Sequence, residues 1–424
     1  MAAGVSAPEA VGRTRRGLAL GQWDSAVTSY YLIAGATALL VAIGLVMVLS
    51  SSSIDSLSLT EGASPYAIFL NQARFALIGL PLAWLASRLP VRFYKRVAWL
   101  FLGFAMFLQL LVPFFGKEVN GNKNWLPLGG FAFQPSELLK LALALWLALV
   151  LARKRALLAQ WAHVLVPGVA VAGLGVGLVL VGRDLGTAII MLLLVAGALF
   201  VAGVPLRMFA VGAVVGVIGV IQLAQANDSR VNRIAAFFDP ECDVLDECLQ
   251  TTRGMYGLAS GGLTGLGLGE SREKWSYLPE AHNDFIFAIL GEELGLLGTL
   301  LVLALFGVLA IAMSRIVRRH EDPFVQVATA GIGAWVLGQA LVNIAVVIGM
   351  LPVVGVPLPL VSAGGSALIT TMVALGVVLS FARQEPGAAE ALAARPGVVR
   401  RSLAVVGRTA RDRRSIRPQR GARA

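Results

Sequence analysis

The sequence predicts an all-α polytopic membrane protein, with about ten transmembrane helices and a large extracytoplasmic loop between helices 7 and 8. Of its 424 residues, 57% are hydrophobic and only 14% are charged, and the mean hydropathy is +0.78. A soluble domain of this length needs more charge to cover its surface. Apolar runs near the roughly 20 residues that a bilayer requires recur along the chain. These observations exclude a soluble globular protein.

Ten such runs form one transmembrane domain, residues 28–383, between two tails. Their expected bounds are 28–50, 67–88, 96–115, 134–152, 161–182, 185–204, 207–226, 284–314, 324–350 and 364–383. The longest connection, residues 227–283, is the expected extracytoplasmic loop.

The two tails are polar and basic. Residues 1–27 carry arginines without an apolar core, so we interpret them as a cytoplasmic tail and not as a cleaved signal peptide. Residues 384–424 are rich in Ala, Gly, Pro and Arg and are expected to be disordered in the cytoplasm. Their arginines favour contact with anionic membrane lipids, at roughly 1 kcal/mol each, over the alternative of docking a cytoplasmic partner.

Basic residues also concentrate in alternate connections between the apolar runs. These residues are Arg88, Arg92, Lys95 and Arg96; Arg153, Lys154 and Arg155; Arg207; and Arg315, Arg318 and Arg319. By the positive-inside rule these connections are cytoplasmic, and both termini are too. The net charge of +11 would suggest nucleic acid as a partner of a soluble protein, but its distribution here fits membrane topology, and we expect no nucleic acid.

Ionisable and polar residues within or beside the spans fall at one end of the predicted bundle, the outer end. They are Arg74, Glu137, Lys140, Arg183, Asp184, Asp284 and the turn 362–366, which contains Ser362. Scattered structural ion pairs have no reason to share a side. The pattern therefore predicts a polar cavity that opens to the outside.

Asp284 is the first candidate for chemistry. It lies in the stretch 277–298, YLPEAHNDFIFAILGEELGLLG, where His282 and other polar residues pass directly into an apolar run. Charged groups at such positions are costly and usually functional. The alternative is that Asp284 caps the N-terminus of the helix.

Two further motifs carry charge. Glu137 and Lys140 are spaced i, i+3 on one helix face, so they are either ligand-binding groups or a pair that neutralises itself. In the segment GRDLGT, Arg183 could hold a phosphate, because guanidinium matches phosphate oxygens. It could also pair with the carboxylate of Asp184, and we favour this second interpretation.

The loop 227–283 contains Arg233, Lys274 and a glycine-rich centre, ASGGLTGLGLGES. It is neither a P-loop nor a dinucleotide fingerprint, because no strand precedes it and GK[ST] is missing. We interpret it as flexible backbone lining the cavity, with cations that either meet an anionic headgroup or form a solvated surface. Cys242 and Cys248 form a candidate disulfide, and two reduced thiols are the alternative. The two cysteines and three histidines are too few and too scattered for a zinc or redox metal site.

Taken together, these motifs resemble the SEDS (shape, elongation, division and sporulation) family. The matching blocks span most of the chain: 125–140 (WLPLGGFAFQPSELLK), 184–188 (DLGTA), 265–269 (GLGLG), 277–295, and 358–362 (LPLVS) followed by two glycines at 364–365. The wording of 277–295 resembles the division-type members more than the elongation-type members. Arg183, Asn283 and Ala363 depart from the family pattern, and the first of these weakens any role carried over to Arg183.

The resemblance implies a peptidoglycan glycosyltransferase that polymerises lipid II at the outer face of the cytoplasmic membrane during septal cell-wall synthesis. It implies a class B penicillin-binding transpeptidase and other divisome proteins as partners. Asp284 falls on the family's essential aspartate and would be the catalytic base. Arg and Lys side chains would hold the departing diphosphate. A divalent cation could add positive charge there, but we assign no cofactor. The residues we assign to substrate binding are Lys274, Arg233, Lys140, Glu137, Arg183, Asp184, His282 and Ser362.

Three other functions fit part of this pattern. A transporter of lipid-linked precursor would also have ten spans, but it predicts charge near the midplane and internal repeats. A non-catalytic scaffold for the transpeptidase would leave Asp284 dispensable. An elongation polymerase would use the same chemistry away from the septum.

Overall fold

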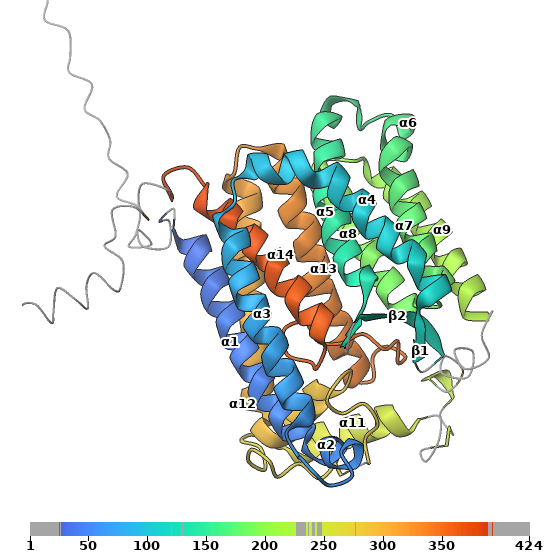
Figure 1. The fold of residues 1–424 in the computed structure, drawn as a ribbon. Coiled ribbons are helices and arrows are strands. Elements are labelled where there is room, and N and C mark those ends of the chain that lie inside the picture. Colours follow the sequence, from blue (N-terminus) through green and yellow to red (C-terminus); the bar gives the residue numbers. More distant parts are fainter. Residues whose placement is uncertain are drawn as a thin grey trace, which may run out of the picture.

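The computed structural model describes residues 25, 27–119, 121–128, 131–225, 235, 237–239, 242–243, 248–275, 277–388 and 392. In these residues the chain is a helix bundle, shown in Figure 1. Both tails, apart from a few flanking residues, lie outside the described part, so the expectations about them stay predictions.

Nine segments in the described part are long and apolar enough to cross a membrane. They are α1 (Thr28–Ser51), α3 (Ala67–Arg88), α4 (Val91–Phe115), α5 (Pro135–Arg153), Trp161–Val181, α8 (Leu185–Ala202), α12 (Ile286–Arg319), α13 (Pro323–Val347) and α14 (Gly365–Arg383). The segment Trp161–Val181 consists of α6 (Trp161–Val164), a π-helical turn (Leu165–Val169) and α7 (Ala170–Val181). The apolar helix α9 (Leu206–Gln225) takes the place of the remaining span. The prediction of about ten transmembrane helices is confirmed.

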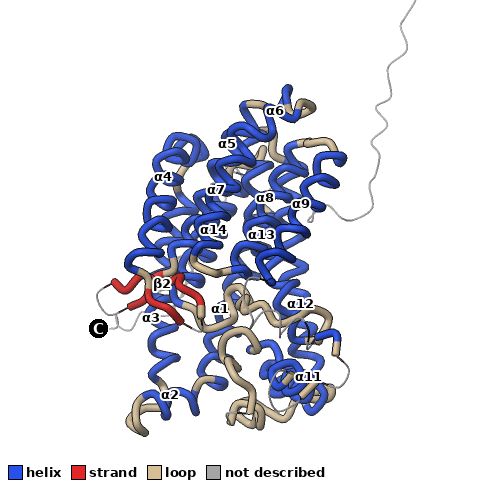
Figure 2. Tube along the Cα trace, turned by 90° about the vertical axis from the view of Figure 1, so that its right-hand side faces the viewer, coloured by secondary structure: helices blue, strands red, loops and turns tan. Residues whose placement is uncertain are grey.

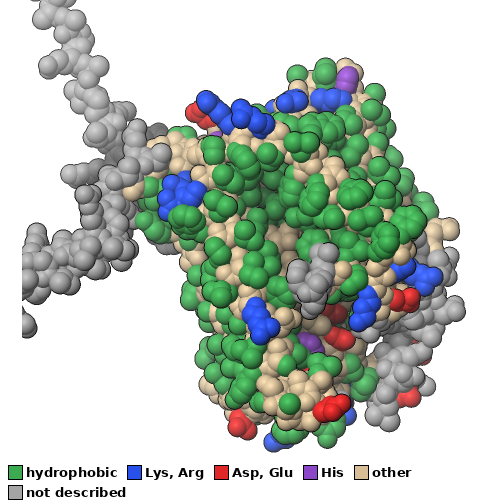
Figure 3. All heavy atoms as spheres, viewed as in Figure 1, with side chains coloured by type: hydrophobic (Ala, Val, Ile, Leu, Met, Phe, Trp, Pro, Cys, Tyr) green, Lys and Arg blue, Asp and Glu red, His purple; other side chains and the backbone are tan. Residues whose placement is uncertain are grey.

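The centre of the bundle is formed by α5 and α13. Nearly every residue of α5 is buried, which explains its uninterrupted run of Leu and Ala, because a helix that is apolar all round belongs in a core. Helix α13 packs against α5 and α8, α14 packs against α3, and α1 packs against α12. Figure 3 shows hydrophobic side chains over the middle of the molecule and Lys and Arg gathered at the α6 end, as the predicted topology requires.

Short elements lie in three of the expected connections between spans. Strands β1 (Lys117–Val119), β2 (Asn122–Leu128) and β3 (Phe131–Phe133) form an antiparallel sheet in the order β1-β2-β3, and helices α2 (Ser53–Leu59) and α11 (Leu249–Ser260) lie in the predicted connections. Figure 2 shows the strands toward the end of the bundle that carries α2 and α11. The backbone N–H of Lys123 donates to Gly182 O at 2.9 Å, which ties the sheet to the turn between α7 and α8.

Helix α12 is broken at Gly295, whose φ is +67° and ψ −165°. The glycine-rich stretch packs into this break, since Leu266 N donates to Glu292 O at 2.9 Å and Leu296 N donates to Gly262 O at 3.0 Å. A Cβ at Gly265 would lie 2.1 Å from Glu293 O, so only glycine allows the approach. The stretch is thus held against α12 by backbone hydrogen bonds, and its expected role as cavity lining stays a prediction.

Candidate active site

Asp284 lies immediately before α12 and is half-buried. Its Oδ2 faces Gly355, and is 3.5 Å from the position that a Cβ on that glycine would occupy. Its backbone carbonyl accepts a hydrogen bond of 2.7 Å from Asn343 Nδ2. The N-cap position of α12 belongs to Phe285, so the alternative role of Asp284 as helix cap does not match where the helix begins.

The connection between α13 and α14 is fastened beside Asp284. Asn343 Nδ2 also donates to Val356 O at 2.8 Å, and Gln339 Nε2 donates to Pro357 O at 2.9 Å. Ser362 Oγ donates to Asn283 O at 2.7 Å and accepts from Leu358 N at 2.7 Å. Ser362 thus contacts the backbone next to Asp284, as an element of the support and not as a free hydroxyl.

Two more segments join this end of the bundle. His282 Nδ1 is 2.9 Å from Asp55 Oδ2, so the histidine pairs with α2. Gln72 of α3 donates from Nε2 to Ser362 O at 3.1 Å and accepts from Gly364 N at 3.0 Å. Residues from α2, α3, α13 and the connection between α13 and α14 therefore meet at the end of the bundle that holds Asp284.

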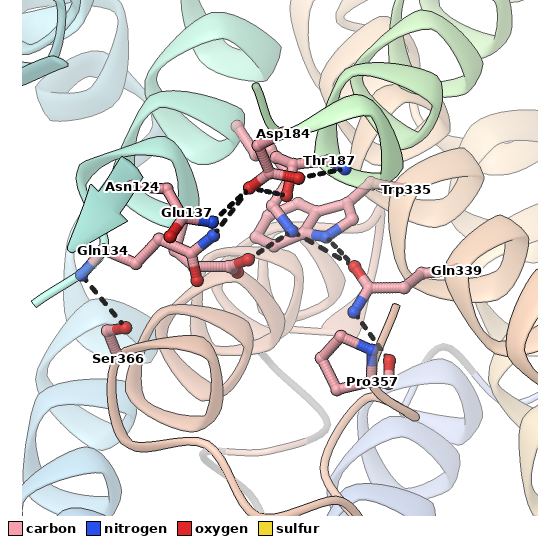
Figure 4. Close-up of polar contacts among 10 residues, drawn as sticks. Asn124, Gln134, Glu137, Asp184, Thr187, Trp335, Gln339, Pro357 and Ser366 are labelled. Carbon is pink, nitrogen blue, oxygen red and sulfur yellow. Dashed lines mark hydrogen bonds and ion pairs between the residues drawn. The ribbon is translucent and has the colours of Figure 1, made fainter. Parts of the chain in front are cut away.

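Glu137 and Lys140 form a buried ion pair in the core. Their Oε1 and Nζ atoms are 2.8 Å apart, and their side chains are 4% and 2% exposed. Lys140 Nζ also donates to Gln339 Oε1 at 3.1 Å and lies 4.7 Å from the centre of the Trp335 ring. Figure 4 shows the side chains of Glu137, Trp335 and Gln339 in this part of the core. The geometry favours the self-neutralising pair over direct binding of substrate.

Asp184 is a buried N-cap of α8. It accepts from Thr187 N at 2.9 Å and Thr187 Oγ1 at 2.8 Å, and from Asn124 Nδ2 at 2.8 Å and Gln134 Nε2 at 3.1 Å (Figure 4). These donors join α8 to β2 and to the start of α5. These four donors to Asp184 come from Thr187, Asn124 and Gln134. Arg183 is exposed and has a φ of +63°. Asp184 is therefore a structural acid, and Arg183 is the more accessible of the two side chains.

A second buried network holds the segment before Asp284 to α12. Glu292 accepts from Ser271 Oγ and, at 2.9 Å, from Arg272 N. Glu293 accepts from Ser50 Oγ of α1 and lies 3.5 Å from Lys274 Nζ. The ammonium of Lys274 is thus already engaged by a carboxylate inside the fold.

Glu273, which sits in this network, has its pKa raised because burial disfavours the charged carboxylate, and the charge of Arg253 offsets part of that effect. Arg253 Nη1 is 3.8 Å from Glu273 Oε1 and its guanidinium stacks over Tyr277. Arg253 thus contacts groups of its own segment, Glu273 and Tyr277.

The remaining site predictions have different outcomes. Arg233 lies outside the described residues. Cys242 and Cys248 form a disulfide, with their Cα atoms 6.1 Å apart. Within the described ranges, no group of three or more His, Cys, Asp or Glu side chains could hold a metal ion.

Sequence reasoning missed the amides that organise the site. Gln339 and Asn343 are 3% and 2% exposed and lie one turn apart on α13, on the face that meets the connection to α14. A signal for them existed, because amides inside an otherwise apolar span must find partners within the protein.

The fold and this site define a polytopic membrane protein with a half-buried carboxylate held at one end of the bundle, where its long connections meet. A family model described as cell cycle protein, covering FtsW, RodA and SpoVE, matches residues 30–386. The chain belongs to this family, which is the SEDS family that the sequence motifs resemble.

Curated relatives agree with this assignment. The chain is 43% identical over 386 residues to a probable peptidoglycan glycosyltransferase FtsW of Mycobacterium tuberculosis, covering 90% of this chain and 72% of the relative. It is 37% identical over 349 residues to a protein of the same description from Coxiella burnetii, covering 81% of this chain and 93% of the relative.

Solved structures share the fold. A chain from a peptidoglycan synthase complex that coordinates polymerization and crosslinking superposes with a TM-score of 0.68 at 29% identity, covering 83% of this chain and 96% of that one. The rod shape determining protein RodA of Thermus thermophilus gives a TM-score of 0.62 at 28% identity, covering 84% and 97%.

Proposed function

We propose that this chain is a peptidoglycan glycosyltransferase that polymerises lipid II into glycan strands at the outer face of the cytoplasmic membrane during cell division. The names of its relatives support the activity. The observation that carries the proposal is the half-buried carboxylate of Asp284, which is held where α12 meets the connection between α13 and α14.

The proposed reaction joins two lipid-linked sugars. Asp284 takes the proton of the acceptor 4-hydroxyl as that oxygen attacks the anomeric carbon of the donor. The bond from that carbon to the diphosphate oxygen breaks with inversion, and the undecaprenyl diphosphate departs with the electron pair. A positioned general base of this kind contributes about 10²–10⁴-fold to a rate.

The departing diphosphate needs positive charge near it. Among the cations that the sequence suggested and the structure describes, the side chain of Arg183 is exposed, whereas the side chains of Lys140 and Lys274 are buried. Arg183 is therefore the described candidate best able to meet the diphosphate. Rearrangement of the pair between Lys274 and Glu293 on substrate binding would add a second cation.

We also propose a class B penicillin-binding transpeptidase and other divisome proteins as partners at the septum, with both termini in the cytoplasm. The similarity to a chain of a peptidoglycan synthase complex supports a partner of this class. The concentration of Lys and Arg at the α6 end supports the orientation.

The test is polymerisation of purified lipid II by the full chain with a cognate transpeptidase that has no glycosyltransferase activity. Asp284→Asn should lower the rate by at least about 100-fold because the base is lost, with the complex still assembled. Glu118→Gln, which removes an exposed carboxylate on β1, is the matched control and should leave the rate unchanged.

Each outcome of this test is informative. Glycan from the wild type and the control but not from Asp284→Asn supports both the activity and the base. Equal glycan from all three removes Asp284 as the base. No glycan from any of them, with an assembled complex, argues for the transporter or the scaffold instead.

A further inference from the structure

The side chain of Asn343 joins the two backbone segments that flank the carboxylate of Asp284. Its Nδ2 donates one hydrogen bond to Asp284 O at 2.7 Å and one to Val356 O at 2.8 Å, so both amide hydrogens are used. Asn343 is 2% exposed and belongs to α13, one of the two central helices. One short side chain on a rigid element therefore sets the separation between Asp284 and the connection that faces it.

The peptide group on the other side of Asp284 is held as well. Ser362 Oγ donates to Asn283 O at 2.7 Å, so the carbonyls immediately before and after the Cα of Asp284 both have fixed partners. With both flanking peptide groups held, the carboxylate keeps only its two side-chain torsions. The facing residue is Gly355, which has a φ of +69° and no side chain. A Cβ added to Gly355 would lie 3.5 Å from Asp284 Oδ2.

The chemistry of this contact is specific to asparagine. Two carbonyl oxygens must be bridged by two N–H groups on one atom, which an amide supplies. Aspartate would present oxygen to both carbonyls, serine has a single hydroxyl hydrogen, and glutamine is one methylene longer. Buried carbonyls left without donors would each be costly, so the bridge restrains the local geometry.

We propose that Asn343 is a positioning residue for glycosyl transfer, which orients the catalytic carboxylate by holding the backbone of Asp284 against the connection between α13 and α14. This inference rests on the proposed function, because it presupposes that Asp284 is the base. It assigns a kinetic role to a buried amide that touches no substrate.

The first variant is Asn343→Leu, which keeps a similar side-chain volume and removes both donors. Its matched control is Ser380→Ala, which also removes a buried donor to a backbone carbonyl, that of Leu89, at the other end of the bundle. Both variants are assayed as full chains with the transpeptidase, for kcat and KM on lipid II and for thermal stability. A misplacement of the base by about 1 Å costs on the order of 100-fold in rate.

Asn343→Leu is expected to lower kcat by about 10–100-fold with KM within about two-fold of wild type, and Ser380→Ala should keep kcat despite a comparable loss of thermal stability. Asn343→Ser retains one donor and should give an intermediate kcat, which provides the test if the leucine variant does not fold. A wild-type kcat in the folded variants, or an equal loss of kcat in the Ser380→Ala control, overturns the positioning role. Full activity of Asp284→Asn would instead remove Asp284 as the base, and an absence of glycan from the wild type would overturn the proposed function.

Discussion

Replacing Lys140 by methionine should destabilise the protein strongly, because it leaves Glu137 as an unpaired carboxylate in the core. The Glu137 side chain is 4% exposed, and the ammonium 2.8 Å from its Oε1 is lost. Its other oxygen, Oε2, has no hydrogen-bond partner among the described residues, so no second contact compensates. Breaking a buried ion pair in this way costs about 3–5 kcal/mol.

The double variant Glu137→Gln, Lys140→Met separates the pair from its individual charges. Removing both charges takes away the attraction together with both desolvation costs, and such replacements are often neutral or stabilising by about 1–4 kcal/mol. The double variant should therefore be much more stable than Lys140→Met. The free energy of unfolding can be followed by tryptophan fluorescence during titration of detergent micelles with SDS.

This reasoning is refuted if Lys140→Met unfolds within about 0.5 kcal/mol of wild type, the range of ordinary surface substitutions. It is also refuted if the double variant is as unstable as the single one. A stable double variant that no longer polymerises lipid II would return Glu137 and Lys140 to the substrate-binding set.

Two further predictions concern the glycine-rich stretch and the end of α14. Gly265→Ala should lower the free energy of unfolding by on the order of 1–3 kcal/mol because of its positive φ alone, and the clash with Glu293 O adds to that loss. Gly212→Ala is the control, because the space around its Cβ position is open, and it should be neutral in the same unfolding titration. Burial raises the pKa of Glu385 above its ordinary 4.5, and the charge of Arg319 offsets part of that rise. The folded state therefore binds the proton more tightly than the unfolded state, so the free energy of unfolding falls as pH rises from 4.5 through the raised pKa. Glu385→Gln should remove that fall and increase stability at pH 7, and an unchanged pH profile of the thermal midpoint would contradict it.

The spans could be predicted from sequence because they depend on a simple quantity, the length of an apolar run. Helix α3 begins and ends at the predicted residues, α14 begins one residue later than predicted, and α5 is shifted by one residue at both ends. The strands β1 to β3 could not be predicted in this way, because two have three residues each and depend on pairing with each other and with Gly182.

The sequence pointed to Asp284 as the candidate base, which stays a prediction, and it did not reveal the contacts around that residue. The family resemblance assigned Glu137, Lys140 and Lys274 to substrate binding, but whether a charge faces a cavity or another charge depends on which helices are neighbours. Neighbouring helices are set by packing between distant parts of the chain, which periodicity does not encode. The partners of Asn343 lie 59 and 13 residues away in sequence, so no local pattern could reveal them.

The break in α12 changes where the two adjacent glutamates stand relative to a membrane. At 1.5 Å per residue, the part that follows Gly295, residues 296–319, is about 36 Å long, and this already exceeds a hydrocarbon core of roughly 30 Å. Residues 286–294, with Glu292 and Glu293, can therefore stand at the level of the lipid headgroups. The break thus separates the length needed for anchoring from the length that carries charge.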